Sequence, residues 1–246
     1  MKASGIPSEA EVTLLEPYRD KLPAEVFGEP YLPPVTDGSG QDRRWLRNAA
    51  KLLADAGCEL KKGKRALPNG QPIVIEFLID EASFQPHHAS FIRNLAQLGI
   101  EASLRLIDAV QFRARVEAFD FDITVERLSL SATPGDSIRP YFTSQAAATK
   151  GSYNLAGIAN PAVDALVETI IAARTRSDLT VACRALDRVF RAGRYWVPQW
   201  YATTHRVAYW DEFSHPEKPA RYAAGVGARE NWWYDTAKAA KLEQAK

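Results

Sequence analysis

The chain has 246 residues, of which 46% are hydrophobic, and this is enough for one large domain or two small ones with a substantial core. Its 31 basic and 30 acidic residues give a formal net charge of +1, so no overall bias indicates a nucleic-acid partner. No apolar run approaches the ~18 residues of a membrane helix, and the first residues, MKASGIPSEAE, lack the apolar core of a secretory signal.

Residues 1–40 have the composition of an extended linker rather than of a domain core. Only 8–18 predicts a short amphipathic helix, with Ser8 as its N-cap and Glu11 completing a capping box. Prolines and glycines are dense over 19–40, and they prevent regular hydrogen bonding. We therefore expect this part to cross a neighbouring surface in an extended form.

Helices and strands alternate over 42–128, and this pattern is typical of an α/β sheet covered by helices. A helix at 42–56 precedes a hairpin whose turn is expected at Asn69-Gly70. Because ligands of such sheets lie beyond the carboxyl ends of the strands, fold-level analogy makes 126–136 the first candidate site. The further elements expected here are a strand at 73–79, a helix at 83–98, a strand at 100–107, a helix at 109–118 and a strand at 121–128.

Within the last hundred residues, helical patterns are followed by stretches rich in aromatic residues. A polar surface loop at 151–160 leads into an αα-hairpin of two helices, 161–175 capped by Asn160 and 177–194 capped by Ser177. Five of the six tryptophans lie after residue 195, within and beyond strand candidates at 195–201 and 206–210. Aromatic side chains at this density need a partner surface, so the sequence indicates that part of the molecule is missing.

No catalytic or metal-binding motif is present. GxSxG, HExxH, the P-loop and GxGxxG in a strand–helix context are all lacking, so a non-enzymatic protein is expected. His87 and His88 are adjacent and would point about 100° apart on a helix, which does not suit one metal ion. Cys58 and Cys183 form no disulfide framework, and a bond between them stays open. We predict no metal and no cofactor.

Several stretches, in a fixed order, resemble a known family. They are EPYLPPVTDGSG with RRWLRNAAKLLADAG, LPNGQPIVIEFLI with FDFDIT, YNLAGIANPAVDALVE, and VPQWYATTHRVAYWDEF with the terminal WWYD. Together they resemble the C-terminal part of the extracellular solute-binding proteins, family 5, of peptide ABC transporters, and most of all the YejA-like branch. The third stretch is similar to the family's NxxGxxNPxVDxL segment, here at 154–166.

The resemblance implies a fold and a function. It implies the second lobe of a two-lobed periplasmic binding protein of type II, an α/β lobe with a mixed sheet flanked by helices at 41–192. Residues 1–40 would be a linker, and 193–246 would be strands and a tail that pack on a missing first lobe. The full-length protein would be a periplasmic monomer that hands peptides or peptide-like solutes to ABC permease subunits. The alternative is a single-lobe module for ligand sensing or protein interaction, without transport.

The resemblance also implies a ligand site at 126–136. In peptide-binding relatives this stretch meets the ligand backbone, and an acidic residue in it often pairs with the peptide's free amine. Leu130 occupies the matching position here, so this chain departs from that pattern. Arg127 is expected to pair with a carboxylate or phosphate instead, its alternative being a solvated arginine at a strand end. The predicted ligand-binding residues are Arg127, Ser129, Leu130, Tyr153 and Asn154.

Two alternatives stay open at the edges of this site. Tyr153 and Asn154 would line the cleft, or else serve as a turn residue and the neighbour of a helix cap. Trp200 and Tyr201 would stack on a ligand, or else belong to the core between the lobes, which the resemblance favours.

Overall fold

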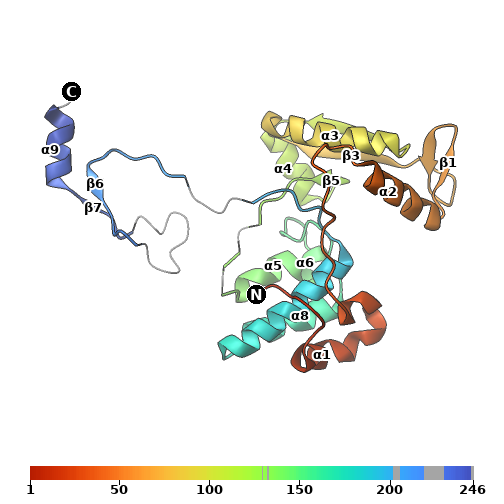
Figure 1. The fold of residues 1–246 in the computed structure, drawn as a ribbon, viewed down its shortest axis with the longest axis horizontal. Coiled ribbons are helices and arrows are strands. Elements are labelled where there is room, and N and C mark those ends of the chain that lie inside the picture. Colours follow the sequence, from red (N-terminus) through yellow and green to blue (C-terminus); the bar gives the residue numbers. More distant parts are fainter. Residues whose placement is uncertain (129, 132, 202–205, 219–229, 245–246) are drawn as a thin grey trace. The chain divides into compact units, whose positions relative to one another are not determined.

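A computed structural model of the chain describes residues 1–128, 130–131, 133–201, 206–218 and 230–244. The chain forms two compact units, Met1–Val197 and Pro198–Lys246 (Figure 1). Among the described residues, no helix has the length and apolar character that crossing a membrane requires.

A three-stranded parallel sheet lies in the first unit, in the order β4-β3-β5. The central strand is β3 (Val74–Ile79), which pairs on either side with β4 (Glu101–Leu106) and the short β5 (Ile123–Thr124). The end of β3 is buried because a central parallel strand is covered on both faces, and Phe77 packs there with Leu95 and Ile100.

Helices predicted between these strands are confirmed. Helix α3 (Gln85–Gln97) follows the 3₁₀ turn η3 (Ala82–Phe84), and α4 (Ala109–Glu117) connects β4 to β5. Helix α2 (Arg43–Asp55) begins at its cap Asp42 and places Leu53 against the same core. The predicted strand at 121–128 is shorter than expected, because only Ile123 and Thr124 pair with β3.

The predicted hairpin is present, but its tightest turn lies elsewhere. Strands β1 (Glu59–Lys61) and β2 (Lys64–Ala66) are joined by Lys62-Gly63, both with positive φ, which suits the twist of a two-residue hairpin. The Asn69-Gly70 turn forms as well and brings Pro72 opposite Ala66. The sequence therefore contains two successive reversals where one was predicted.

A second core is formed by helices. Its elements are α1 (Glu9–Leu15), η1 (Glu16–Lys21), η2 (Ala24–Phe27), η4 (Asp136–Ile138), α5 (Arg139–Phe142), α6 (Ser144–Ala147), α7 (Pro161–Ala172) and α8 (Arg176–Gly193). The αα-hairpin of α7 and α8 is confirmed, but the N-cap of α8 is Thr175, whose hydroxyl accepts from the Asp178 N–H, rather than Ser177.

The N-terminal residues contribute to this second core, although residues 1–40 were expected to be a linker outside the core, with a short helix at 8–18 and an extended part at 19–40. Leu15 and Val26 are fully buried in it, because α1 and the two 3₁₀ turns bring them onto α7 and α8. The capping box expected at Ser8 and Glu11 forms partly: the Ser8 hydroxyl accepts from the Glu11 N–H.

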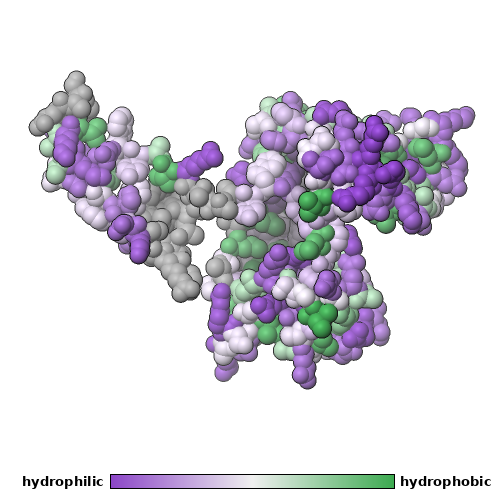
Figure 2. All heavy atoms as spheres, viewed as in Figure 1, coloured by the Kyte–Doolittle hydropathy of each residue, from purple (hydrophilic) through white to green (hydrophobic). Residues whose placement is uncertain are grey.

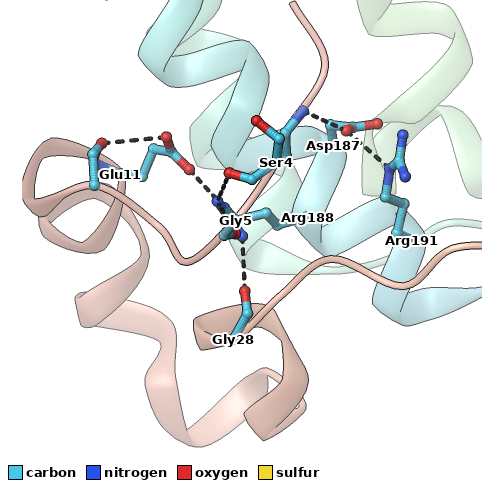
Figure 3. A network of polar contacts seen from close by, with 9 residues as sticks. Ser4, Gly5, Glu11, Gly28, Asp187, Arg188 and Arg191 are labelled. Atoms are coloured by element: carbon cyan, nitrogen blue, oxygen red, sulfur yellow. Dashed lines mark hydrogen bonds and ion pairs between the residues drawn. The ribbon is translucent and has the colours of Figure 1, made fainter.

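Figure 3 shows a polar network that fastens the N-terminal segment to α8. Arg188 donates from Nε to the Glu11 carboxylate over 2.6 Å and from its terminal nitrogens to backbone carbonyls, including that of Gly28 at 2.9 Å. The preceding residue, Asp187, accepts from the Ala3 N–H. Main-chain carbonyls near the proline-rich stretch thus gain partners from a helix instead of from a sheet.

The second unit is small and rich in exposed aromatic side chains. It contains the antiparallel pair β6 (Phe213–Ser214) and β7 (Trp233–Tyr234), followed by α9 (Thr236–Gln244). The strands predicted at 195–201 and 206–210 do not form, because the described residues of both stretches have no strand partner; 202–205 lie outside the described residues.

Candidate ligand-binding site

The carboxyl ends of the three parallel strands converge at one edge of the sheet. Strands β3, β4 and β5 end at Ile79, Leu106 and Thr124, and the Thr124 hydroxyl donates to the Leu78 carbonyl over 3.1 Å. The chain then leaves this edge as an irregular segment that includes 125–128. The position that sequence analysis selected is therefore a strand end, as ligand sites of such sheets require.

Arg127 lies in this segment with an exposed side chain. Its backbone N–H donates to Oε1 of the neighbouring Glu126 over 3.0 Å. Within the described part of the chain, no ion pair or hydrogen bond engages its guanidinium group. Such a group is a ready partner for a carboxylate or phosphate, which it can bind through two parallel N–H bonds.

Of the other two predicted residues of the segment, the structure describes only one. Leu130 is exposed, so the position that matches the family's acidic residue presents an apolar side chain. Ser129 lies outside the described residues, and its predicted role stays a prediction.

The acidic side chain at the far end of the segment is already paired. Asp136 forms an ion pair with Arg139, which also binds Glu168 through Nε and Nη2 at 2.7 and 2.6 Å. The hydrogen bond from Arg139 lowers the pKa of the Glu168 carboxyl. Asp136 is therefore a poor substitute for the missing acidic partner of a peptide amine.

Tyr153 stacks on Tyr141, with ring centroids 4.9 Å apart and planes 16° from parallel. Its backbone N–H donates to the Pro140 carbonyl, and this fixes the ring over α5. The side chain of Tyr153 is 58% exposed, so the outer face of the pair is open to solvent. An aromatic face of this kind can stack on a planar group or on the C–H face of a sugar.

Asn154, by contrast, is 1% exposed, and its side chain forms hydrogen bonds with backbone groups. Its side-chain nitrogen donates to the carbonyls of Thr143 and Ile158, and its oxygen accepts from the Ile158 N–H at 2.9 Å. These bonds give Asn154 a structural role, and its predicted place in the ligand site stays a prediction. They also explain why 151–160 is not wholly a surface loop.

The structure thus provides two groups of candidate residues. The strand-end group contains Arg127 and Leu130, and the second group contains Tyr153 on Tyr141. No hydrogen bond or ring contact joins the groups among the residues described. Sequence reasoning missed Tyr141, because the stacking depends on the fold of two short helices and follows no sequence period.

Histidines and cysteines add no site. His88 is buried, and its Nδ1 lies 2.8 Å from the Phe84 carbonyl. The described residues contain no group of three or more His, Cys, Asp or Glu side chains that could hold a metal ion. Cys58 and Cys183 are free thiols, and burial raises the pKa of Cys183.

Comparison with known proteins finds relatives over nearly the whole chain. The sequence is 40% identical to a probable peptide-binding protein YejA of Agrobacterium fabrum, over 95% of this chain and 38% of that protein. It is 36% identical to the uncharacterized protein YejA of Escherichia coli, over 99% of this chain and 40% of that protein. The peptidoglycan-binding protein YepA of A. fabrum is 32% identical, over 92% of this chain and 36% of that protein.

The chain therefore spans about two fifths of the length of these relatives. No protein-family model matches the sequence. The relatives with descriptive names are binding proteins and not enzymes, in agreement with the expectation from the lack of catalytic motifs.

Solved structures share the fold. A periplasmic oligopeptide-binding protein of an ABC transporter from Thermotoga maritima matches 63% of this chain and 31% of its own, with a TM-score of 0.57 and 21% identity. The oligopeptide-binding protein AppA of Bacillus subtilis, solved with a nonapeptide, matches 76% of this chain and 38% of its own, with a TM-score of 0.55 and 17% identity.

These likenesses confirm the predicted fold class, a lobe of a periplasmic binding protein of the peptide-binding cluster. Over nearly its whole length the chain is therefore similar to YejA-like proteins, of which it spans a part, and it shares the fold of periplasmic oligopeptide-binding proteins.

Proposed function

We propose that the chain is part of the solute-binding component of an ABC importer and captures peptides or peptide-containing solutes in the periplasm. The observation that carries the proposal is the 40% identity, over 95% of the chain, to a probable peptide-binding protein. The structural neighbours named as periplasmic oligopeptide-binding proteins support the same role. Permease subunits would be the membrane partners.

The strand-end group favours a ligand with a negative charge. Arg127 offers an exposed guanidinium group, whereas Leu130 offers no charge to a peptide amine. We therefore infer that recognition at this edge is directed to a carboxylate of the solute rather than to a free amino terminus.

The stacked pair of Tyr153 and Tyr141 adds a second recognition element. Its open aromatic face suits a sugar or another flat group. One relative is named a peptidoglycan-binding protein, and a peptide joined to sugar rings would use both a cation and an aromatic face. Ligands of this mixed class belong in the screen beside free peptides.

The proposal includes the predicted division into lobes. Residues 41–192 would form most of the second lobe, and 193–246 would pack on a first lobe that lies outside this chain. Binding proteins of this kind enclose the solute between two walls, and one wall alone binds weakly because less of the solute is removed from water. Affinity is therefore best measured on the longer protein that contains this chain.

The test compares Arg127→Ala with the unchanged protein by calorimetric titration. Free-acid peptides and sugar-linked peptides are each titrated beside matched ligands whose carboxyl groups are amidated. We expect Arg127→Ala to weaken binding of the acids by roughly tenfold, since hydrogen bonds between charged groups contribute about 1.5–3 kcal/mol. The substitution should also remove the preference for the acid over the amide.

The matched control is Arg174→Ala, which removes an exposed arginine outside the candidate site. It should leave affinity unchanged, and neither substitution should alter the melting temperature much, because both side chains are solvated. Equal binding of acid and amide by the unchanged protein would remove Arg127 from recognition. Failure to bind any of these solutes would contradict the proposed transport role and favour a sensing or interaction module.

A further inference from the structure

Positive charge is concentrated in one stretch of a nearly neutral chain. Residues 41–65 contain eight Lys or Arg and three Asp or Glu, a net charge of +5, whereas the whole chain carries +1. The stretch folds as α2 followed directly by the β1–β2 hairpin. Figure 1 shows these elements next to each other at one end of the first unit, and this end is largely hydrophilic in Figure 2.

Helix α2 presents its basic residues as a stripe. Arg43, Arg47 and Lys51 recur every four residues and are exposed, on the side away from Leu53, which packs in the sheet core. Arg44 is also exposed, but it donates to the Val35 carbonyl and lies over the ring of Trp45. The stripe is therefore a solvent-facing surface without a role in the core.

The hairpin extends the positive surface with Lys61, Lys62 and Lys64, all exposed around its turn. Arg65 does not take part, because it is buried and donates to the Cys58 and Leu98 carbonyls. The basic face is defined here as Arg43, Arg47, Lys51, Lys61, Lys62 and Lys64.

Nearby carboxylates neutralise this face only in part. Lys51 pairs with Asp55, Lys61 with Glu59, and Lys64 with Glu101 of β4. The remaining acidic neighbour is Asp42, which caps α2. Surface pairs of this kind are weak and exchange readily for other partners. In the described structure no carboxylate engages Arg43, Arg47 or Lys62.

Two leucines are exposed within the same elements. Leu52 on α2 is 60% exposed, and Leu60 on β1 is 55% exposed. They lie on other sides of these elements than the basic residues, because Leu52 is about 140° around α2 from Arg47 and Leu60 pairs with the buried Arg65, opposite Lys61 and Lys64. The basic face is therefore polar throughout, which suits electrostatic attraction to anionic lipid headgroups. A stable protein interface would instead need a larger apolar centre, which two separate leucines do not supply.

We propose that the basic face binds the surface of an anionic phospholipid bilayer. The arginines and lysines would contact lipid phosphates. The whole-chain charge hides this property, because the rest of the chain carries a net charge of −4. Attraction of this kind acts within a Debye length, so it would hold the chain at the membrane reversibly.

The test is co-sedimentation of the chain with vesicles of phosphatidylcholine alone or with about a third phosphatidylglycerol. The variant Arg43→Gln, Arg47→Gln, Lys62→Gln removes the three unpaired charges. The matched control Lys150→Gln, Arg174→Gln, Arg184→Gln removes three exposed charges from other parts of the first unit. All six side chains are solvated, and circular dichroism verifies that both variants are folded.

We expect binding to the phosphatidylglycerol vesicles at low salt, its loss at high salt, and roughly tenfold or greater weakening in the basic-face variant only. Equal binding to neutral and anionic vesicles would overturn the proposal, as would equal weakening in the control variant. Absence of vesicle binding together with capture by an acidic polypeptide would reassign the basic face to a protein partner.

Discussion

Asn154 and Arg188 are two of the buried polar residues of the first unit, and Asn154 holds a turn together. Its three side-chain bonds close the segment between α6 and α7. Asn154→Ala would leave the carbonyl and the N–H of Ile158 without a partner, while the Thr143 carbonyl would keep the Ala147 N–H. We therefore expect a loss of about 2–3 kcal/mol of unfolding free energy. Urea unfolding measures this loss.

The comparison variant is Asn48→Ala, an exposed asparagine on α2, which should change stability by less than about 0.5 kcal/mol. Solute titration of folded Asn154→Ala separates the two interpretations of this residue. Unchanged affinity is expected from a structural role, and a loss of affinity without a loss of stability would restore Asn154 to the ligand site.

Arg188 holds two distant parts of the chain together. The side chains of Arg188 and Glu11 are 1% and 4% exposed, and the pair joins α8 to α1 across 177 residues of sequence. Arg188→Met would leave the Glu11 carboxylate buried without a counter-charge, so we expect a loss of about 3–5 kcal/mol. Chemical denaturation of the variant checks this value.

Two further variants make this measurement specific. Arg184→Met changes an exposed arginine on the same helix and should be nearly neutral. Adding Glu11→Leu to Arg188→Met should recover part of the stability, because the unpaired charge is then gone. If the double variant is no more stable than Arg188→Met, the backbone carbonyls that Arg188 binds, and not Glu11, account for the loss.

Interactions between residues close in the sequence could be predicted from it, and interactions between distant residues could not. Asn160 caps α7 as its position before Pro161 predicted, because capping depends on the next two or three residues. The partner of Arg188 could not be found in this way. No local rule joins a helix arginine to a glutamate near the other end of the chain, and the first forty residues were therefore predicted to lie outside the core.

Elements with strong hydrophobic periods formed close to their predicted bounds, because burial of one face dictates both period and length. The predicted helix at 83–98 corresponds to α3 and the predicted strand at 73–79 to β3. The aromatic stretches after 195 were predicted as strands from composition alone. A strand also needs a hydrogen-bonded neighbour, and none forms for their described residues.

The start of α8 supplies a test at the scale of an element. The Thr175 hydroxyl accepts from the Asp178 N–H at 3.1 Å, whereas Ser177 lies inside the helix. Thr175→Ala should therefore cost about 1 kcal/mol, and Ser177→Ala should be close to neutral or slightly stabilising, since alanine is the better helix former. Thermal unfolding of the two variants decides between the caps, and the reverse order would place the helix start two residues later.

The position of the candidate site in the chain could be predicted from the sequence, but the contacts among its side chains could not. That 126–136 follows a parallel strand could be derived from the alternation of elements, and the exposure of Arg127 agrees with it. Which side chains join it depends on how loops from different parts of the chain meet. Tyr141 and the pairing of Arg139 with Glu168 are examples, because Tyr153 reaches Tyr141 from the loop after α6 and Glu168 lies on α7.

At the scale of the molecule, the second unit leaves aromatic surface uncovered. Tyr201 is 85% and Trp210 72% exposed, and such side chains contribute most when they are buried against a partner. Together with the greater length of the relatives, this predicts that the native product is more than twice the 27.3 kDa of this chain and resides in the periplasm.

The measurement is an immunoblot of fractionated source cells with an antibody raised against this chain. A larger band released with the periplasm is expected, since the missing mass would supply both the second wall of the solute site and the cover for the aromatic side chains. A cytoplasmic marker protein controls for leakage between the fractions. A single band at 27.3 kDa that stays with the cytoplasm would contradict the importer proposal. The exposed tyrosines and tryptophans would then need another partner, and self-association of the chain would be the first alternative to measure.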